Sequence, residues 1–189
     1  MHSEMKIIVA ITAASGAIYA RQLLERLVAD ERVERIAVVY STHARAVVAH
    51  EGVQLPMSPK ICEYDNGDMF APIASGSASW GAMVVVPSSV GTIGRVASGV
   101  SQNLIERAAD VMLKERRRLI FVVRETPYSL IHLRNMTTLT EAGAIILPAS
   151  PSFYSQPHDI EMLCMTVTER LLSLLGLTGA YYEWGEEQE

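Results

Sequence analysis

Residues 6–17 read KIIVAITAASGA, and the order of residue types in this stretch decides the fold. Residues 6–12 form a short apolar run rich in β-branched side chains, which is typical of a strand buried on both faces. Small residues follow at once, and apolar residues then recur at helical spacing, at Ala20, Leu23, Leu24, Leu27 and Val28. A buried strand that passes through a tight turn into an amphipathic helix predicts the first unit of an α/β fold.

The same alternation continues along the chain. Further buried strands are predicted at residues 35–41, 82–87, 119–124 and 144–148. Helices are predicted at residues 101–118 and along a C-terminal apolar stripe made of Ile160, Leu163, Val167, Leu171 and Leu174. Residues 52–79 hold prolines and glycines without a sustained period, so we expect a long ordered loop there. The pattern predicts a Rossmann-like, doubly wound parallel sheet in a single domain spanning residues 1–189.

Composition excludes several classes of protein. The formal net charge of the 189 residues is −5, which argues against general nucleic-acid binding, because phosphate backbones require a basic face. The two cysteines, Cys62 and Cys164, form no metal-ligand pattern, and their small number suits a reducing compartment. No apolar run approaches the roughly 20 residues that span a membrane, and the first residues do not resemble a signal peptide. We therefore expect a cytoplasmic protein with no membrane span and no metal site.

Small and hydroxyl residues follow three of the predicted strands. In doubly wound sheets, ligands bind beyond the carboxyl ends of the strands. Ala13, Ala14 and Ser15 follow the first strand, and residues 89–92 follow the third; each group can form a cradle for an anion at a helix N-terminus. Ser41 follows the second strand, where a helix N-cap is the more common role. An ordinary tight turn remains the alternative for the first group, but two cradles together point to one phosphorylated ligand.

Charged residues at three further places have both a structural and a functional interpretation. Arg107 and Lys114 share one helix face with Asp110 between them, which suits either a surface ladder of ion pairs or a phosphate site. Arg124 and Glu125 end a buried strand, where burial requires a partner for each charge, and here we favour function over a structural ion pair.

Arg170 falls within the C-terminal apolar stripe and therefore calls for an anion, either from the protein or from a ligand. Tyr154 precedes the same helix and could share that anion. A salt bridge in a coiled coil or at a subunit interface is the competing interpretation.

Several stretches together resemble one family. They are residues 12–19 (TAASGAIY), 75–77 (SGS), 103–111 (NLIERAADV), 113–117 (LKERR), 124–127 (RETP) and 132–136 (HLRNM), with Phe153, Tyr154 and Pro157. In this set the sequence resembles the UbiX flavin prenyltransferase family, and the resemblance extends to Trp184.

The resemblance implies a flavodoxin-like, three-layer αβα fold and a homododecamer with active sites between subunits. It implies that reduced FMN, the acceptor, is held by Ala13, Ala14, Ser15, Ser41, Ser89, Val90, Gly91, Thr92 and Arg124. It implies that dimethylallyl monophosphate is held by Tyr154, Arg170, Arg107 and Lys114, and that Glu125, Lys114, Ser15 and Glu51 are catalytic. The implied product is prenylated FMN, which a UbiD-type decarboxylase uses.

The sequence departs from the family pattern at three places: Ala13 replaces a glycine, Ser88 replaces a cysteine, and Met69-Phe70 stand where a tryptophan is common. Alternative functions are a flavin-dependent cysteine decarboxylase, an aromatic-acid decarboxylase or a non-catalytic FMN-binding protein. The cysteine decarboxylases usually carry a P-x-M-N-x-x-M-W segment, which this sequence lacks.

Overall fold

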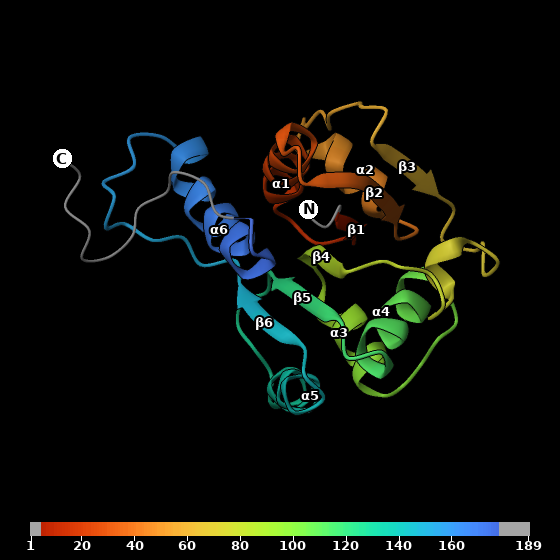
Figure 1. The fold of residues 1–189 in the computed structure, drawn as a ribbon. Coiled ribbons are helices and arrows are strands. Elements are labelled where there is room, and N and C mark those ends of the chain that lie inside the picture. Colours follow the sequence, from red (N-terminus) through yellow and green to blue (C-terminus); the bar gives the residue numbers. More distant parts are fainter. Residues whose placement is uncertain (1–4, 178–189) are drawn as a thin grey trace.

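The computed structural model describes residues 5–177, so Trp184, where the family resemblance ends, lies outside the described residues. A six-stranded parallel sheet runs through the middle of the molecule, with helices on both faces (Figure 1). The strands are β1 (Met5–Ile11), β2 (Val33–Tyr40), β3 (Ile61–Tyr64), β4 (Ala82–Ser88), β5 (Arg118–Val123) and β6 (Ile145–Pro148). Their order is β3-β2-β1-β4-β5-β6, which confirms the predicted doubly wound sheet and puts the topological switch point between β1 and β4.

One strand lies inside the segment that was predicted to be a loop. Residues 52–79 contain β3, which pairs with β2 at the sheet edge, and a short 3-10 helix, η1 (Pro72–Ala74). The prediction was wrong here because β3 has only four residues and is half-exposed, so its side chains give no run that a periodicity argument can detect.

Two helical layers cover the sheet (Figure 1). One face carries α1 (Ala17–Ala29), α2 (Ala44–His50) and α6 (Ile160–Leu175), which share the first core cluster. The other face carries α3 (Val90–Ala97), α4 (Leu104–Lys114) and α5 (Leu130–Glu141), which share the second core cluster. This arrangement confirms the three-layer αβα fold.

The central strands explain why the sheet is stable. Ile7, Val9 and Val84 face the first cluster, whereas Ile8 and Met83 face the second, and all five side chains are fully buried. Side chains that alternate between two apolar layers leave no polar face, which is why these strands read as continuous apolar runs.

The predicted stripe on α6 needs a correction. The buried side chains of this helix are Cys164, Val167, Thr168, Leu171, Leu172 and Leu175, whereas Ile160 is 73% exposed. Arg170 is also exposed, so the argument that it lies in a buried stripe was wrong. The helix packs against α1 through a face that does not include Ile160 or Arg170. The spacing of apolar residues did not predict which face of the helix is buried.

Within residues 5–177, no helix combines the length and the apolar character that crossing a membrane requires. The cytoplasmic location and the single domain spanning residues 1–189 stay predictions.

Candidate functional site at the β1–β4 switch point

Hydrogen bonds join the loops that follow β1, β2 and β4. The Ala13 amide donates to Ser41 Oγ at 3.1 Å, which ties the first loop to the second. Thr12 Oγ1 donates to the Pro87 carbonyl oxygen at 2.8 Å and accepts from the Ser89 amide at 2.8 Å. The three predicted ligand-binding loops therefore form one continuous surface at the carboxyl edge of the sheet.

Ser41 does not cap α2, although a cap was its favoured interpretation. The N-cap residue is His43, whose side chain forms no capping hydrogen bond. Ser41 instead holds the backbone at Ala13, where the family pattern has a glycine. Among the described non-glycine residues, only Arg116 and Gln156 have positive φ, so the backbone at Ala13 is one that a side chain tolerates.

The Glu51 side chain lies at the N-terminus of α1. Its carboxylate accepts from the Gly16 amide at 3.0 Å and from the Ala17 amide at 2.7 Å, and it is hydrogen-bonded to the Ser15 side chain. Burial raises the pKa of Glu51, but these hydrogen bonds and the charge of Arg124 outweigh burial and hold its pKa below the usual value. A helix N-terminus favours an anion, and here the protein supplies one.

The N-terminus of α3 is capped differently. Ser89 is the N-cap, and its Oγ accepts from the Thr92 amide at 3.3 Å and contacts Thr92 Oγ1 at 3.0 Å. Val90 and Gly91 form the first turn, beside the β1 loop. This helix start therefore offers the anion-binding geometry that the sequence predicted for residues 89–92.

Arg124 and Glu125 lie at the end of β5, close to the same surface. The Arg124 amide donates to the Ser88 carbonyl oxygen at 3.2 Å, and its side chain is exposed. Glu125 is half-buried, and its Oε1 accepts from the Thr126 amide at 2.9 Å. Within residues 5–177 Arg124 forms no ion pair with a carboxylate, so the structural ion pair weighed from the sequence is not present.

Arg107 and Lys114 lie on the exposed side of α4. Arg107 pairs with Asp110 at 2.7 Å and donates from Nε to the Ala74 carbonyl oxygen at 3.0 Å, whereas Lys114 pairs with Glu115. A Cβ added to Gly76 would lie 2.7 Å from Lys114 Nζ, so this loop lies directly against the lysine side chain. The two cations and the 75–77 loop form one cluster, but Asp110 does not bridge the cations as a ladder would.

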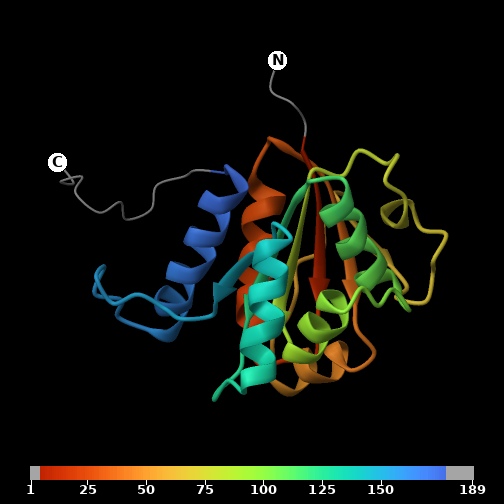
Figure 2. The same cartoon turned by 90° about the horizontal axis from the view of Figure 1, so that it is seen from below.

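Tyr154 and Arg170 lie far from that cluster. Arg170 is on α6, on the sheet face opposite to α4, and Tyr154 precedes α6 and is 71% exposed (Figures 1 and 2). A single chain therefore does not bring the four predicted prenyl-phosphate residues together.

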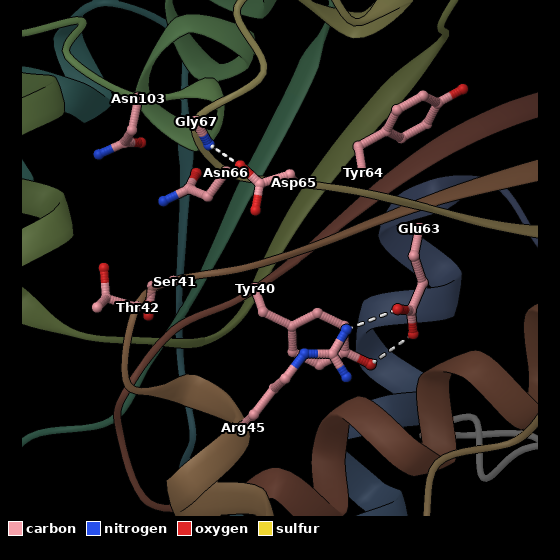
Figure 3. Close-up of a pocket in the computed structure, with 10 residues that line it drawn as sticks. All are labelled: Tyr40, Ser41, Thr42, Arg45, Glu63, Tyr64, Asp65, Asn66, Gly67 and Asn103. Atoms are coloured by element: carbon pink, nitrogen blue, oxygen red, sulfur yellow. Dashed lines mark hydrogen bonds and ion pairs between the residues drawn. The ribbon is translucent and has the colours of Figure 1, made fainter.

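A cavity of about 690 Å³ opens beside Ser41, between the ends of β2 and β3 and the start of α4 (Figure 3). Its lining includes Thr42, Asn66 and Asn103, which the sequence analysis did not select. Asn103 caps α4, and Asn66 Oδ1 accepts from the Ile105 amide at 3.1 Å. Asn103 could have been predicted, because it is a polar residue directly ahead of an apolar helix. Asn66 could not, because its partner, the Ile105 amide, is distant in the sequence.

Part of the lining of this cavity is an ion pair whose guanidinium stacks on a tyrosine ring. The Arg45 guanidinium lies 3.8 Å from the centre of the Tyr40 ring and 2.6 Å from Glu63 (Figure 3). Arg45 and Glu63 also line a second, smaller cavity of about 290 Å³, whose other walls are mainly apolar. The Arg45–Glu63 pair therefore lines both cavities.

Comparisons with known proteins agree with this geometry. The Flavoprotein family matches residues 1–176. The flavin prenyltransferase UbiX of Pseudomonas aeruginosa is 43% identical over 99% of this chain and 97% of its own length. Two solved structures are also similar. AnUbiX (PadA1), in complex with FMN and dimethylallyl pyrophosphate, has a TM-score of 0.86 at 39% identity, over 96% of this chain and 99% of its own. A dodecameric FMN-dependent UbiX-like decarboxylase from Escherichia coli O157:H7 has a TM-score of 0.88 at 34% identity, over 97% of this chain and 100% of its own.

The level of identity and the nearly complete coverage of both chains settle the family. The joined loops at the switch point are the part of the fold where a flavin is expected to bind. This chain belongs to the Flavoprotein family and, within it, to the UbiX flavin prenyltransferases.

Proposed function

We propose that this chain transfers a dimethylallyl group from a dimethylallyl phosphate to reduced FMN and so makes prenylated FMN. The observation that carries the proposal is the junction of the β1, β2 and β4 loops, with Glu51 and Arg124 beside it. These loops contain residues that the family resemblance assigns to the flavin. The solved relative AnUbiX is in complex with FMN and dimethylallyl pyrophosphate.

The loops fit a flavin in three respects. The small side chains at residues 13–16 leave the backbone accessible, and the start of α3 offers amides to an anion. The exposed Arg124 side chain adds positive charge beside these loops. We assign Ala13, Ala14, Ser15, Ser41, residues 89–92 and Arg124 to flavin binding.

The chemistry divides between the chain and its substrates. Reduced FMN, when bound, supplies the nucleophile that replaces the phosphate of the donor. Arg107, Lys114 and Arg170 supply positive charge, which stabilises the negative charge that develops on the leaving phosphate. Tyr154 donates a hydrogen bond to the same phosphate. Glu125, half-buried beside Arg124, accepts or returns a proton.

A second copy of the chain completes the donor site in this proposal. Arg107 and Lys114 lie on the opposite sheet face from Arg170, so one molecule cannot surround one phosphate with all three. Large apolar side chains are exposed in several segments: Met57, Phe70, Leu130, Ile131, Phe153, Tyr154 and Ile160. Such exposure is typical of a surface that another subunit covers. We therefore propose a homo-oligomer, with the dodecamer of the similar Escherichia coli protein as the expected size.

The product leaves for a second enzyme. Prenylated FMN is a cofactor rather than an end product, and we propose that a UbiD-type decarboxylase takes it up in the cytoplasm.

The direct test is anaerobic incubation with reduced FMN and dimethylallyl monophosphate, followed by mass analysis of the flavin. We expect the mass to rise by one dimethylallyl unit, and we expect a parallel run with the pyrophosphate to show which donor is preferred. Release of CO₂ from an aromatic acid, with the flavin mass unchanged for both donors, would support the decarboxylase alternative instead.

A further inference from the structure

A buried carboxylate on α4 contacts α3 through Arg95. Glu106, on α4, has a side chain only 1% exposed, and both of its oxygens are used. Oε1 accepts from Arg95 Nε at 2.5 Å, and Oε2 accepts from the Gln102 amide at 2.9 Å. Burial raises the pKa of Glu106, but the hydrogen bonds from Arg95, Gln102 and Asn103 outweigh burial and lower its pKa overall. The carboxylate is therefore held ionised and fixed in one orientation.

Arg95 carries this fixed orientation to the flavin loop. Its guanidinium is about half-exposed, and its Nη2 donates to Thr92 Oγ1 at 3.4 Å. A Cβ added to Gly91 would lie 3.4 Å from Arg95 Nη1, so the guanidinium also borders the first turn of α3. The hydrogen bond from Nε to Glu106 orients the planar group towards that turn.

Arg95 favours one direction for the hydrogen bond between the hydroxyls of Thr92 and Ser89. A guanidinium only donates, so Thr92 Oγ1 accepts from Arg95 and has its own proton free for Ser89 Oγ, 3.0 Å away. Ser89 Oγ accepts from the Thr92 amide, so with the Thr92 hydroxyl as a second donor both of its lone pairs are used. In that arrangement the Ser89 proton is available to a ligand acceptor beside the β1 loop.

We infer that Glu106 and Arg95 are positioning residues, which orient the Ser89 hydroxyl as a hydrogen-bond donor to an acceptor atom of bound FMN. The inference rests on the proposed flavin site, and neither residue is among those assigned to ligand contact. Glu106 acts through Arg95, Arg95 through Thr92, and Thr92 through Ser89.

The test uses the affinity of the apo protein for oxidised FMN, measured by quenching of flavin fluorescence. In Glu106→Gln, the side-chain oxygen can still accept from the Gln102 amide. The side-chain NH₂ group then faces Arg95, and because both groups are donors, the guanidinium loses its hydrogen bond to residue 106. We expect the dissociation constant to rise about tenfold, the effect of one lost charge-assisted hydrogen-bond chain. Arg95→Lys keeps the charge but loses the fork, so a smaller rise is expected. Ser89→Ala combined with Glu106→Gln should weaken binding no more than Ser89→Ala alone, because both changes remove the same donor.

Thr168→Val is the matched control for loss of stability. Thr168 is as buried as Glu106, and its hydroxyl donates to Gln22. Both residues lie on the sheet face opposite to Glu106. Thr168→Val should therefore lower the unfolding temperature but leave FMN affinity unchanged. Wild-type affinity in both Glu106→Gln and Arg95→Lys would overturn the inference, as would additive effects of Ser89→Ala and Glu106→Gln. If Glu106→Gln does not fold, Arg95→Lys and its combination with Ser89→Ala decide the question. A wild-type protein that does not bind FMN would contradict the proposed function itself.

Discussion

At the scale of single residues, Glu51 is the side chain that ties the most parts of the site together. Its carboxylate accepts hydrogen bonds from two backbone amides at the start of α1 and is hydrogen-bonded to Ser15. The positive charge of Arg124 also stabilises its ionised form. A carboxylate in this position stabilises the fold only while it is ionised. Its effect on stability should therefore depend on pH.

We predict the direction of that dependence. The pKa of Glu51 in the folded protein lies below its value of about 4.3 in an unfolded chain, so its stabilisation is complete above that value. The stabilisation is lost as the pH falls through the folded-state pKa. Glu51→Gln should lower the free energy of unfolding by roughly 1 kcal/mol near neutrality. Urea unfolding of both proteins at several pH values would measure this, and a difference that does not shrink on acidification would contradict the assignment.

At Ser88, unlike at Glu51, removal of the polar group is expected not to lower stability. The buried Ser88 hydroxyl has no partner in the protein, and an unsatisfied buried polar group costs about 1–3 kcal/mol. Ser88→Ala should leave the apo protein equally stable or more stable, and thermal unfolding checks this. A clearly lower unfolding temperature would show that the hydroxyl has a protein partner.

A variant of Glu125 distinguishes FMN binding from the rate of the reaction. Glu125→Gln keeps the acceptor oxygen that the Thr126 amide uses but removes the proton-transfer group. We expect FMN affinity to stay within about twofold and turnover to fall by roughly 100-fold, in line with the usual contribution of a general acid or base. Flavin titration and the rate of prenylated-FMN formation measure the two effects, and unchanged turnover would remove Glu125 from the proton-transfer role.

At the scale of the elements, α6 is attached to α1 by a buried polar network. Gln22, fully buried on α1, donates to the Glu161 carbonyl oxygen at 2.9 Å and to its carboxylate at 2.8 Å, and accepts from Thr168 at 2.9 Å. The network fixes the helix that carries Arg170 relative to the helix that begins at the flavin loop.

Gln22→Leu tests how much this network contributes. The substitution fills similar space but leaves the Thr168 hydroxyl without its partner, so we expect a loss of about 1–3 kcal/mol in the free energy of unfolding. Faster amide hydrogen exchange in α6 than in α4 should accompany it. Glu34→Gln, at an exposed ion pair with Lys6, is the control that should change neither quantity. An unchanged exchange rate in α6 would contradict the attachment.

The elements also show what sequence reasoning could and could not predict. Strands such as β1 and β4 were predictable because burial on both faces leaves an uninterrupted apolar run. The edge strand β3 and the rotation of α6 were missed, since four half-exposed residues have no period and a stripe does not say which side docks. Ser41 was misjudged as a cap because its partner, the Ala13 amide, is distant in sequence.

At the scale of the whole molecule, the donor site that we propose needs more than one copy of the chain. The predicted donor residues lie on both sheet faces, and the resemblance that named them could not say which copy supplies each one. Ile131, 69% exposed on α5, is part of the apolar surface that we expect another subunit to cover. Ile131→Glu should shift the protein to smaller oligomers in light scattering, whereas Gln54→Glu, also at an exposed position, should not. An unchanged mass for Ile131→Glu would place the interface elsewhere.

The most direct measurement of a shared active site is prenylated-FMN formation by mixed oligomers of two inactive variants. Arg107→Ala removes a cation from α4 and Arg170→Ala removes one from α6, so each variant alone should be strongly impaired. In oligomers co-assembled from equal amounts, with both tags recovered together, about a quarter of the sites should draw both intact residues from different copies. Activity near that fraction of wild type is the predicted result. Mixed oligomers no more active than either variant would contradict a donor site built between subunits.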